Sequence, residues 1–171
     1  MLQDPITHEN TAPDIRVSQS HGVRPKLLAV SSGGGHWVQM MRIKHAFEDC
    51  NPIFVTVHES YRAQVPGYKF YLVNDANRWT KLGLLKAARR LAWIVYQERP
   101  DVVISTGAAP GYLALRFGRL VGARTIWLDS IANAEKLSMS GDHVGRCADL
   151  WLTQWPHLAR PNGPYYVGSV L

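Results

Sequence analysis

The 171-residue sequence has little cysteine, little charge and no long hydrophobic run. Its two cysteines, Cys50 and Cys147, form neither a metal-ligand spacing nor a disulfide framework, which indicates a reducing compartment. No stretch is long and apolar enough to cross a bilayer, and the first two dozen residues have no apolar signal-peptide core. The sequence therefore shows no sign of export. The spacing of its histidines and cysteines predicts no metal site.

The charge that is present is mostly positive. Only 19% of residues are charged, yet 19 Lys and Arg outnumber 13 Asp and Glu, which gives a formal charge of +6. This excess favours an anionic partner, such as nucleic acid, a phosphorylated substrate or an acidic membrane face. Because no recognisable nucleic-acid motif accompanies the cations, we predict no nucleic-acid partner.

The chain divides into a polar beginning and one folded domain. Residues 1–25 contain Pro, Asn, Ser and Asp and no apolar run, which predicts a flexible polar leader. Residues 26–171 have the size of a single domain, and the chain is 46% hydrophobic. Short apolar runs then alternate with helical patterns, which predicts an α/β, Rossmann-like open parallel sheet with helices on both faces. Strands are expected at 26–31, 52–57, 69–73, 101–105, 125–129, 149–153 and 165–168. Helices are expected at 36–48, 80–98, 110–121 and 141–147.

The turn "SSGGGHW" after the first strand is the first candidate site. It is neither a P-loop nor a dinucleotide fingerprint, because Gly33, Gly34 and Gly35 are consecutive and no Gly-Lys-Ser/Thr follows. Unshielded backbone N–H groups at a helix N-terminus suit a phosphate or diphosphate. A tight strand-to-helix turn without a ligand is the alternative.

Two side chains are candidates for proton transfer. His36 falls in the first helical turn, where the macrodipole disfavours the imidazolium, so a neutral ring could accept a proton from an attacking hydroxyl. Packing or a structural hydrogen bond would explain it equally well. Asp129 ends the fifth strand and could act as a base or orient a hydroxyl, although aspartates in such places are often helix caps.

A second glycine-bearing turn, "STGAAPGY", follows the fourth strand. Thr106, Gly107 and Gly111 could supply more donors to the same crevice, with Pro110 beginning the next helix. In open α/β sheets ligands bind outside the carboxyl ends of the strands, which is where both turns are expected. An ordinary strand-to-helix connection is the alternative.

The predicted helix 80–98 has two apolar faces. Its core stripe is expected to contain Leu84, Leu85, Ala88, Leu91, Ala92 and Val95. The opposite face is expected to combine apolar and cationic side chains, namely Leu82, Lys86, Arg89, Arg90, Trp93 and Ile94, with Arg78, Trp79 and Lys81 just upstream. Aromatic and aliphatic groups among cations suit an anionic membrane surface. A solvated basic face or a second packing interface would have the same composition.

Five segments carry a resemblance to a known family: "SSGGGH", "DVVISTGAAPG", "LDSIANAEKLSMSG", "ADLWLTQWPHL" and "YYVGSVL". They resemble the acceptor-side, membrane-associated subunit of the split N-acetylglucosaminyltransferase that extends dolichyl-diphosphate-GlcNAc, and its bacterial relatives in exopolysaccharide and capsule assembly. The similarity covers nearly all of 26–171, and "QWP" is its most specific piece. More distantly, the chain resembles the N-terminal half of the single-chain enzyme that adds GlcNAc to lipid I.

The resemblance implies the N-terminal, acceptor half of a GT-B glycosyltransferase. It places the acceptor diphosphate at Gly33, Gly34, Gly35, His36, Thr106 and Gly107, and membrane contact on the helix near Trp79. Asp129 stands where these families have an acidic residue. The implied reaction moves a sugar from a UDP-sugar, bound mainly by a partner chain, to a polyprenyl-diphosphate-linked sugar, without a cofactor.

Departures from the family pattern shape these expectations. The transmembrane helix of the eukaryotic subunit and the second Rossmann-like domain are not found in the sequence, so we expect peripheral attachment at the cytoplasmic face of the plasma membrane and a donor-binding partner. The second loop has fewer glycines than that of the single-chain enzyme. A non-catalytic anchor or activator, or a standalone nucleotide-binding module, are the other hypotheses.

Overall fold

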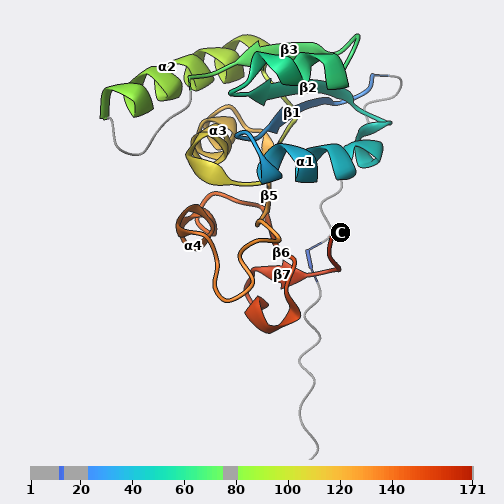
Figure 1. Ribbon diagram of the computed structural model, residues 1–171, viewed down its shortest axis with the longest axis vertical. Coiled ribbons are helices and arrows are strands. Elements are labelled where there is room, and N and C mark those ends of the chain that lie inside the picture. The colour runs from blue at the N-terminus through green and yellow to red at the C-terminus, as the bar shows by residue number, and fades with distance from the viewer. Residues whose placement is uncertain (1–11, 14–22, 75–80, 171) are drawn as a thin grey trace, which may run out of the picture.

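A seven-stranded, wholly parallel sheet forms the centre of the protein, seen in a computed structural model that describes residues 12–13, 23–74 and 81–170 (Figure 1). The strand order is β3-β2-β1-β4-β5-β6-β7. The strands are β1 (Lys26–Val30), β2 (Asn51–Thr56), β3 (Lys69–Leu72), β4 (Val102–Ser105), β5 (Arg124–Leu128), β6 (Leu150–Thr153) and β7 (Tyr165–Tyr166). The predicted fold class is confirmed, with each strand within two residues of its expected bounds.

Four α-helices and three 3-10 helices connect the described strands. They are α1 (Gly35–Arg42), η1 (Lys44–Phe47), η2 (Glu59–Gln64), α2 (Lys81–Glu98), α3 (Ala108–Leu120), α4 (Met139–Val144) and η3 (Pro156–Leu158). The predicted helix 36–48 is divided at Ile43, whose ψ of 2° interrupts the α-helical backbone. The sequence patterns did not predict η2 or η3, because such short helices lack a hydrophobic period.

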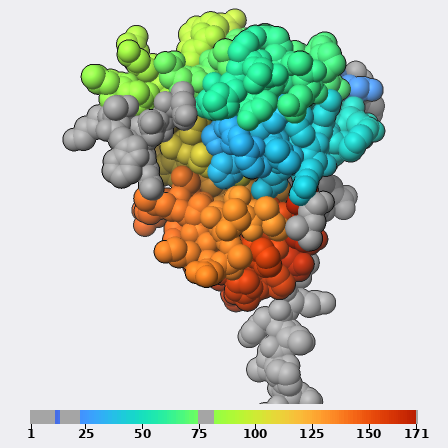
Figure 2. Space-filling view, in the orientation of Figure 1, coloured from blue at the N-terminus to red at the C-terminus, as the bar shows by residue number. Residues whose placement is uncertain are grey.

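The sheet is covered by helices on both faces, as predicted. Alternate residues of β1 enter two separate clusters: Leu28 and Val30 pack with side chains of α2 and α3, whereas Leu27 and Ala29 pack with Trp37 of α1. Successive side chains of a strand point to opposite faces, so both faces of this strand are apolar. In Figure 2 the described residues from β1 to α2 form the upper part of the molecule, and those from α4 to β7 form the lower part.

The core face of α2 differs from the predicted stripe. Leu84 and Leu85 are 38% and 57% exposed, whereas Ile94, which was expected on the outer face, is completely buried. The helix is rotated so that Ala87 and Ile94 face the sheet beside Leu91. Its beginning also extends to the side of the fold (Figure 1), away from the cluster that buries its later turns. Apolar spacing alone could not predict that rotation, because α2 carries apolar residues on more than one side.

A buried carboxylate ties the end of α2 to the edge of the sheet. Glu98 is 4% exposed; its Oε1 lies 2.6 Å from Lys69 Nζ and also accepts a hydrogen bond from the Tyr71 hydroxyl. Burial by itself raises the pKa of this carboxyl group, but the bonds from Lys69 and Tyr71 outweigh it and hold the pKa below the ordinary glutamate value. Glu98 is therefore an ionised anchor for β3.

Candidate functional site

The two predicted glycine loops meet where the strand order reverses. β1 pairs with both β2 and β4, so the chain winds outward in opposite directions from the β1–β4 pair. The two glycine loops follow β1 and β4. The carboxyl ends of parallel strands at such a switch point form the usual ligand crevice of open α/β sheets.

Two reciprocal hydrogen bonds join the loops. The Thr106 hydroxyl donates to the His36 carbonyl oxygen at 2.7 Å, and His36 Nδ1 lies 2.8 Å from the Thr106 carbonyl oxygen. A carbonyl oxygen only accepts, so the ring must carry its proton on Nδ1, which leaves the lone pair of Nε2 free in the neutral form. The half-buried His36 ring thus has a fixed tautomer and a basic nitrogen.

Gly107 is required for this arrangement. A Cβ atom at Gly107 would lie 2.4 Å from the His36 ring, and the φ of +136° is a conformation that other residues rarely adopt. The glycine therefore places the second loop directly against the imidazole.

The first turn of α1 presents unused donors. The Gly34 carbonyl accepts from the N–H groups of Trp37 and Val38, and the Gly34 N–H donates to the Tyr61 hydroxyl at 2.9 Å. Among the described residues no acceptor bonds the N–H groups of Gly33, Gly35 or His36. With the positive end of the helix dipole, these three groups form a site suited to an anion.

The second loop contributes donors other than those predicted. The Thr106 hydroxyl is engaged by His36, and the Gly107 N–H donates to Ser105 Oγ at 3.1 Å. Gly111 packs against Ser105, where a Cβ atom would overlap its hydroxyl. The helix begins at Ala108, two residues before the expected Pro110. Within the described structure this loop holds His36 in place, and the free N–H groups at its helix are those of Ala108 and Ala109.

Sequence reasoning missed two aromatic residues at the first loop. The Tyr61 ring stacks on Trp37 with centroids 4.8 Å apart and planes 4° apart, and the His58 ring meets it edge-on at 5.5 Å. A Cβ atom at Gly33 would lie 2.5 Å from the His58 ring, so that ring closes one side of the loop. Their position after β2, at the same edge of the sheet, is the signal that could have revealed them.

Asp129 is buried and fully hydrogen-bonded. It is 1% exposed; Oδ1 accepts from Ser138 Oγ at 2.7 Å and Trp127 Nε1 at 3.2 Å, while Oδ2 accepts from the Ser138 N–H at 3.1 Å and Asn133 Nδ2 at 3.3 Å. Ser138 in turn caps α4 by accepting from the Gly141 N–H. Asp129 therefore holds the cap residue of α4 without being the cap itself.

The "QWP" segment organises the same loop. Gln154 donates to the Asp129 carbonyl at 2.9 Å, and the Trp155 indole donates to the Ile131 carbonyl at 2.9 Å. Gln39 of α1, which the sequence patterns did not single out, donates to the same Asp129 carbonyl and accepts from the Ile131 N–H. These buried bonds connect α1 to the segment that follows β5.

Several residues of the predicted membrane surface are exposed on α2. Leu82, Lys86, Arg89 and Arg90 are exposed, and Trp93 is 46% exposed with the Arg90 guanidinium 4.6 Å above its ring. The exposed apolar side chains of Leu84, Leu85 and Tyr96 enlarge this surface. Trp79 and Arg78 lie outside the described residues. Every helix in the described part of the chain is too short or too polar to cross a bilayer.

Comparison with solved structures places this fold in the GT-B class. The chain resembles MurG of Acinetobacter baumannii, with a TM-score of 0.66 and 14% identity over 85% of this chain and 46% of that one. It also resembles UDP-N-acetylglucosamine 2-epimerase of Rickettsia bellii, with a TM-score of 0.62 and 14% identity over 81% and 41%. The predicted correspondence to a Rossmann-like half of a GT-B protein is confirmed.

One curated protein gives the sequence relationship. The chain is 32% identical over 81 residues to the UDP-N-acetylglucosamine transferase subunit ALG14 of Yarrowia lipolytica. The matched segment covers 43% of this chain and 38% of that protein. No family model matches the chain. This chain spans less than half the length of the proteins that it matches. The predicted resemblance to acceptor-side subunits of split GT-B glycosyltransferases is thereby confirmed.

Proposed function

We propose that this protein is the acceptor-side subunit of a two-component glycosyltransferase in exopolysaccharide or capsule assembly. It binds a polyprenyl-diphosphate-linked sugar at the cytoplasmic face of the plasma membrane, and a partner chain supplies the UDP-sugar. One observation carries the proposal: the reciprocal bonds between His36 and Thr106 hold the His36 ring, with its Nε2 unbonded, beside three unused N–H groups. The similarity to a transferase subunit supports it.

In this proposal the first loop binds the acceptor diphosphate. The N–H groups of Gly33, Gly35 and His36 donate to phosphate oxygens, and the dipole of α1 adds its positive end. Gly34 is the N-cap that turns the chain, since its φ is +64° and its own N–H donates to Tyr61. Thr106 and Gly107 position the loop and the histidine, and the N–H groups of Ala108 and Ala109 are a second set of donors in this proposal.

His36 is the proposed general base. Nε2 takes the proton from the acceptor hydroxyl as that oxygen attacks the anomeric carbon of the donor sugar and the UDP group leaves. The resulting imidazolium is stabilised by the Thr106 carbonyl at Nδ1. Asp129 is the weaker candidate because four donors already bind its carboxylate, so we propose that it acts by holding the 130–138 loop.

Four donors occupy the Asp129 carboxylate, which leaves it no free oxygen for proton transfer. This favours a second candidate function, a non-catalytic anchor and activator. In this case the partner carries every proton-transferring group. The two candidates differ in what happens when His36 loses its basic nitrogen while the assembly stays intact.

The test is a transfer assay on membranes with a lipid-diphosphate acceptor and a panel of UDP-sugars, comparing the chain alone with the chain plus its candidate partner. We expect turnover only in the mixture. In His36→Asn the amide can still donate to the Thr106 carbonyl but lacks the base, so we expect kcat to fall about 10²–10⁴-fold with unchanged association. An unchanged kcat would favour the anchor, and turnover by the chain alone would contradict the two-component proposal.

A further inference from the structure

A separate groove lies between α3 and α4. It has a volume of about 1150 Å³ and includes no residue of the glycine loops. Its lining includes Tyr112, Arg116, Arg119, Leu120, Arg146 and Trp151. In Figure 1 the two helices lie one above the other on the same side of the molecule. The proposed acceptor site uses none of these side chains.

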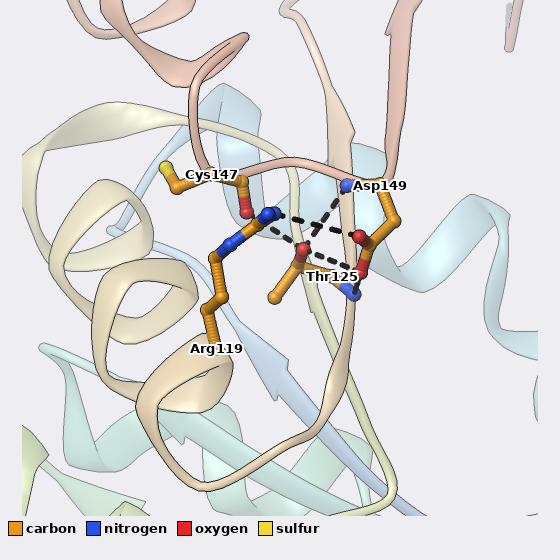
Figure 3. A network of polar contacts seen from close by, with 4 residues as sticks. All are labelled: Arg119, Thr125, Cys147 and Asp149. Atoms are coloured by element: carbon orange, nitrogen blue, oxygen red, sulfur yellow. Dashed lines mark hydrogen bonds and ion pairs between the residues drawn. The ribbon is translucent and has the colours of Figure 1, made fainter.

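The groove is cationic at its sides. Arg116, Arg119 and Arg146 are exposed and line it, and Asp142 is the carboxylate among its described lining residues. Arg119 Nη1 approaches Oδ1 of Asp149 at 3.5 Å, while Oδ2 of that carboxylate accepts from the N–H and hydroxyl of Thr125 at 2.8 and 3.0 Å (Figure 3). The three arginines outnumber the two carboxylates Asp142 and Asp149, so the groove keeps a positive excess that attracts anions.

Apolar and unmet polar groups lie between the arginines. Leu120 is 82% exposed, and the Tyr112 ring lies along α3 with its hydroxyl accepting from Arg116 at 3.3 Å. The Trp151 indole nitrogen is buried and bonds no partner among the described residues.

Size and shape select among anionic occupants. A small anion would leave the exposed apolar side chain of Leu120 uncovered. A flat bilayer surface cannot enter a concave groove. A helix with carboxylates on its sides and apolar residues on one face matches the charge, the apolar floor and the shape. We propose that the α3–α4 groove binds an acidic amphipathic helix of a partner protein.

The first test uses a fluorescein-labelled synthetic helix of about four turns, with glutamates on its sides and leucines on one face, in anisotropy titrations. Arg116→Glu/Arg146→Glu is compared with Lys86→Glu/Arg89→Glu, which makes the same charge change on exposed residues of α2. We expect the groove variant to bind at least about tenfold more weakly and the α2 variant less than about threefold. A lysine version of the helix should bind the groove variant better than the wild type. Equal losses in both variants would overturn the proposal.

Location and competition complete the test. When the peptide is added, the backbone amide NMR signals that shift should be those of α3 and α4. If the peptide binds with about micromolar affinity, a 10-fold excess of inorganic phosphate over the peptide should not displace it. Shifts confined to α1 or α2, or displacement by phosphate, would overturn the helix assignment. Vesicles with anionic lipid should bind the groove variant as they bind the wild type; a loss equal to that of the α2 variant would assign the groove to the bilayer instead. Urea unfolding of both variants verifies that they remain folded.

Discussion

At the scale of single residues, the site depends on which atoms are already bonded. His36 keeps one free ring nitrogen because the Thr106 carbonyl fixes the proton on the other. Asp129 has no such free atom, since both of its oxygens accept two bonds. Residue types alone made both side chains candidates for proton transfer, and their neighbours distinguish them.

Replacing Gly107 by alanine tests how tightly the loops fit. Gly107→Ala should lower the free energy of unfolding by roughly 2–4 kcal/mol, because the methyl group meets the His36 ring and the backbone conformation is strained for alanine. Gly122→Ala is the matched control, since Gly122 also has a positive φ but no atom within 4 Å of the added Cβ; it should lose about 1 kcal/mol. Urea unfolding measures both. Equal losses would show that the ring does not constrain this position.

The buried Glu98 makes stability depend on acid pH. Its pKa is held below the ordinary value of 4.5 because Lys69 and Tyr71 outweigh the effect of burial. The stabilisation is therefore complete above pH 4.5 and is lost as the pH falls through the folded-state pKa. Glu98→Gln should lower the free energy of unfolding at pH 7 by about 1–3 kcal/mol. The loss is no larger because solvent screens the exposed Lys69 ammonium. The difference from wild type should shrink below pH 4.5 in denaturant titrations, and a constant difference down to pH 3 would contradict this account.

At the scale of elements, the 130–138 loop and α4 form one unit held from Asp129. Asp129→Asn replaces an acceptor oxygen with a donor facing existing donors, so we expect a loss of roughly 2–4 kcal/mol and faster hydrogen exchange over residues 130–144. Ser138→Ala removes the cap and should lose less, about 1–2 kcal/mol. If Asp129→Asn were as stable as wild type but inactive in the assembled pair, Asp129 would be a catalytic group and not a positioning one.

The exposed face of α2 should determine membrane binding. Each cation near an anionic bilayer contributes about 1 kcal/mol, so Lys86→Glu/Arg89→Glu should weaken binding to vesicles with anionic lipid by at least about 30-fold. Sedimentation with vesicles measures this, and neutral vesicles should bind both proteins weakly. Arg116→Glu/Arg146→Glu carries the same charge change away from α2 and should bind as the wild type does. A similar loss in both variants would show that this helix face does not by itself determine membrane binding.

Helix rotation marks the limit of what apolar spacing could predict. The strands and the two glycine loops follow from local patterns, because buried parallel strands are short apolar runs and their turns require glycine. Leu85 and Ile94 were assigned to the wrong faces, since the direction of the core is a property of the sheet and not of the helix. The partners of Gln39 come from distant parts of the chain, so no local pattern could reveal it. Tyr61 and His58 could have been found only from the topology, because the segment after β2 reaches the same edge of the sheet.

At the scale of the whole molecule, the central position of β1 constrains how the protein is made. Leu27 pairs with Pro52 on one side and with Val102 on the other, so one flank of this apolar strand has no partner until β4 has left the ribosome. A nascent chain that ends within α2 exposes a sheet edge open to aggregation. β1 is thus enclosed only after β2, β3 and α2 have been made, and a fragment that ends before β4 should require a chaperone to remain soluble.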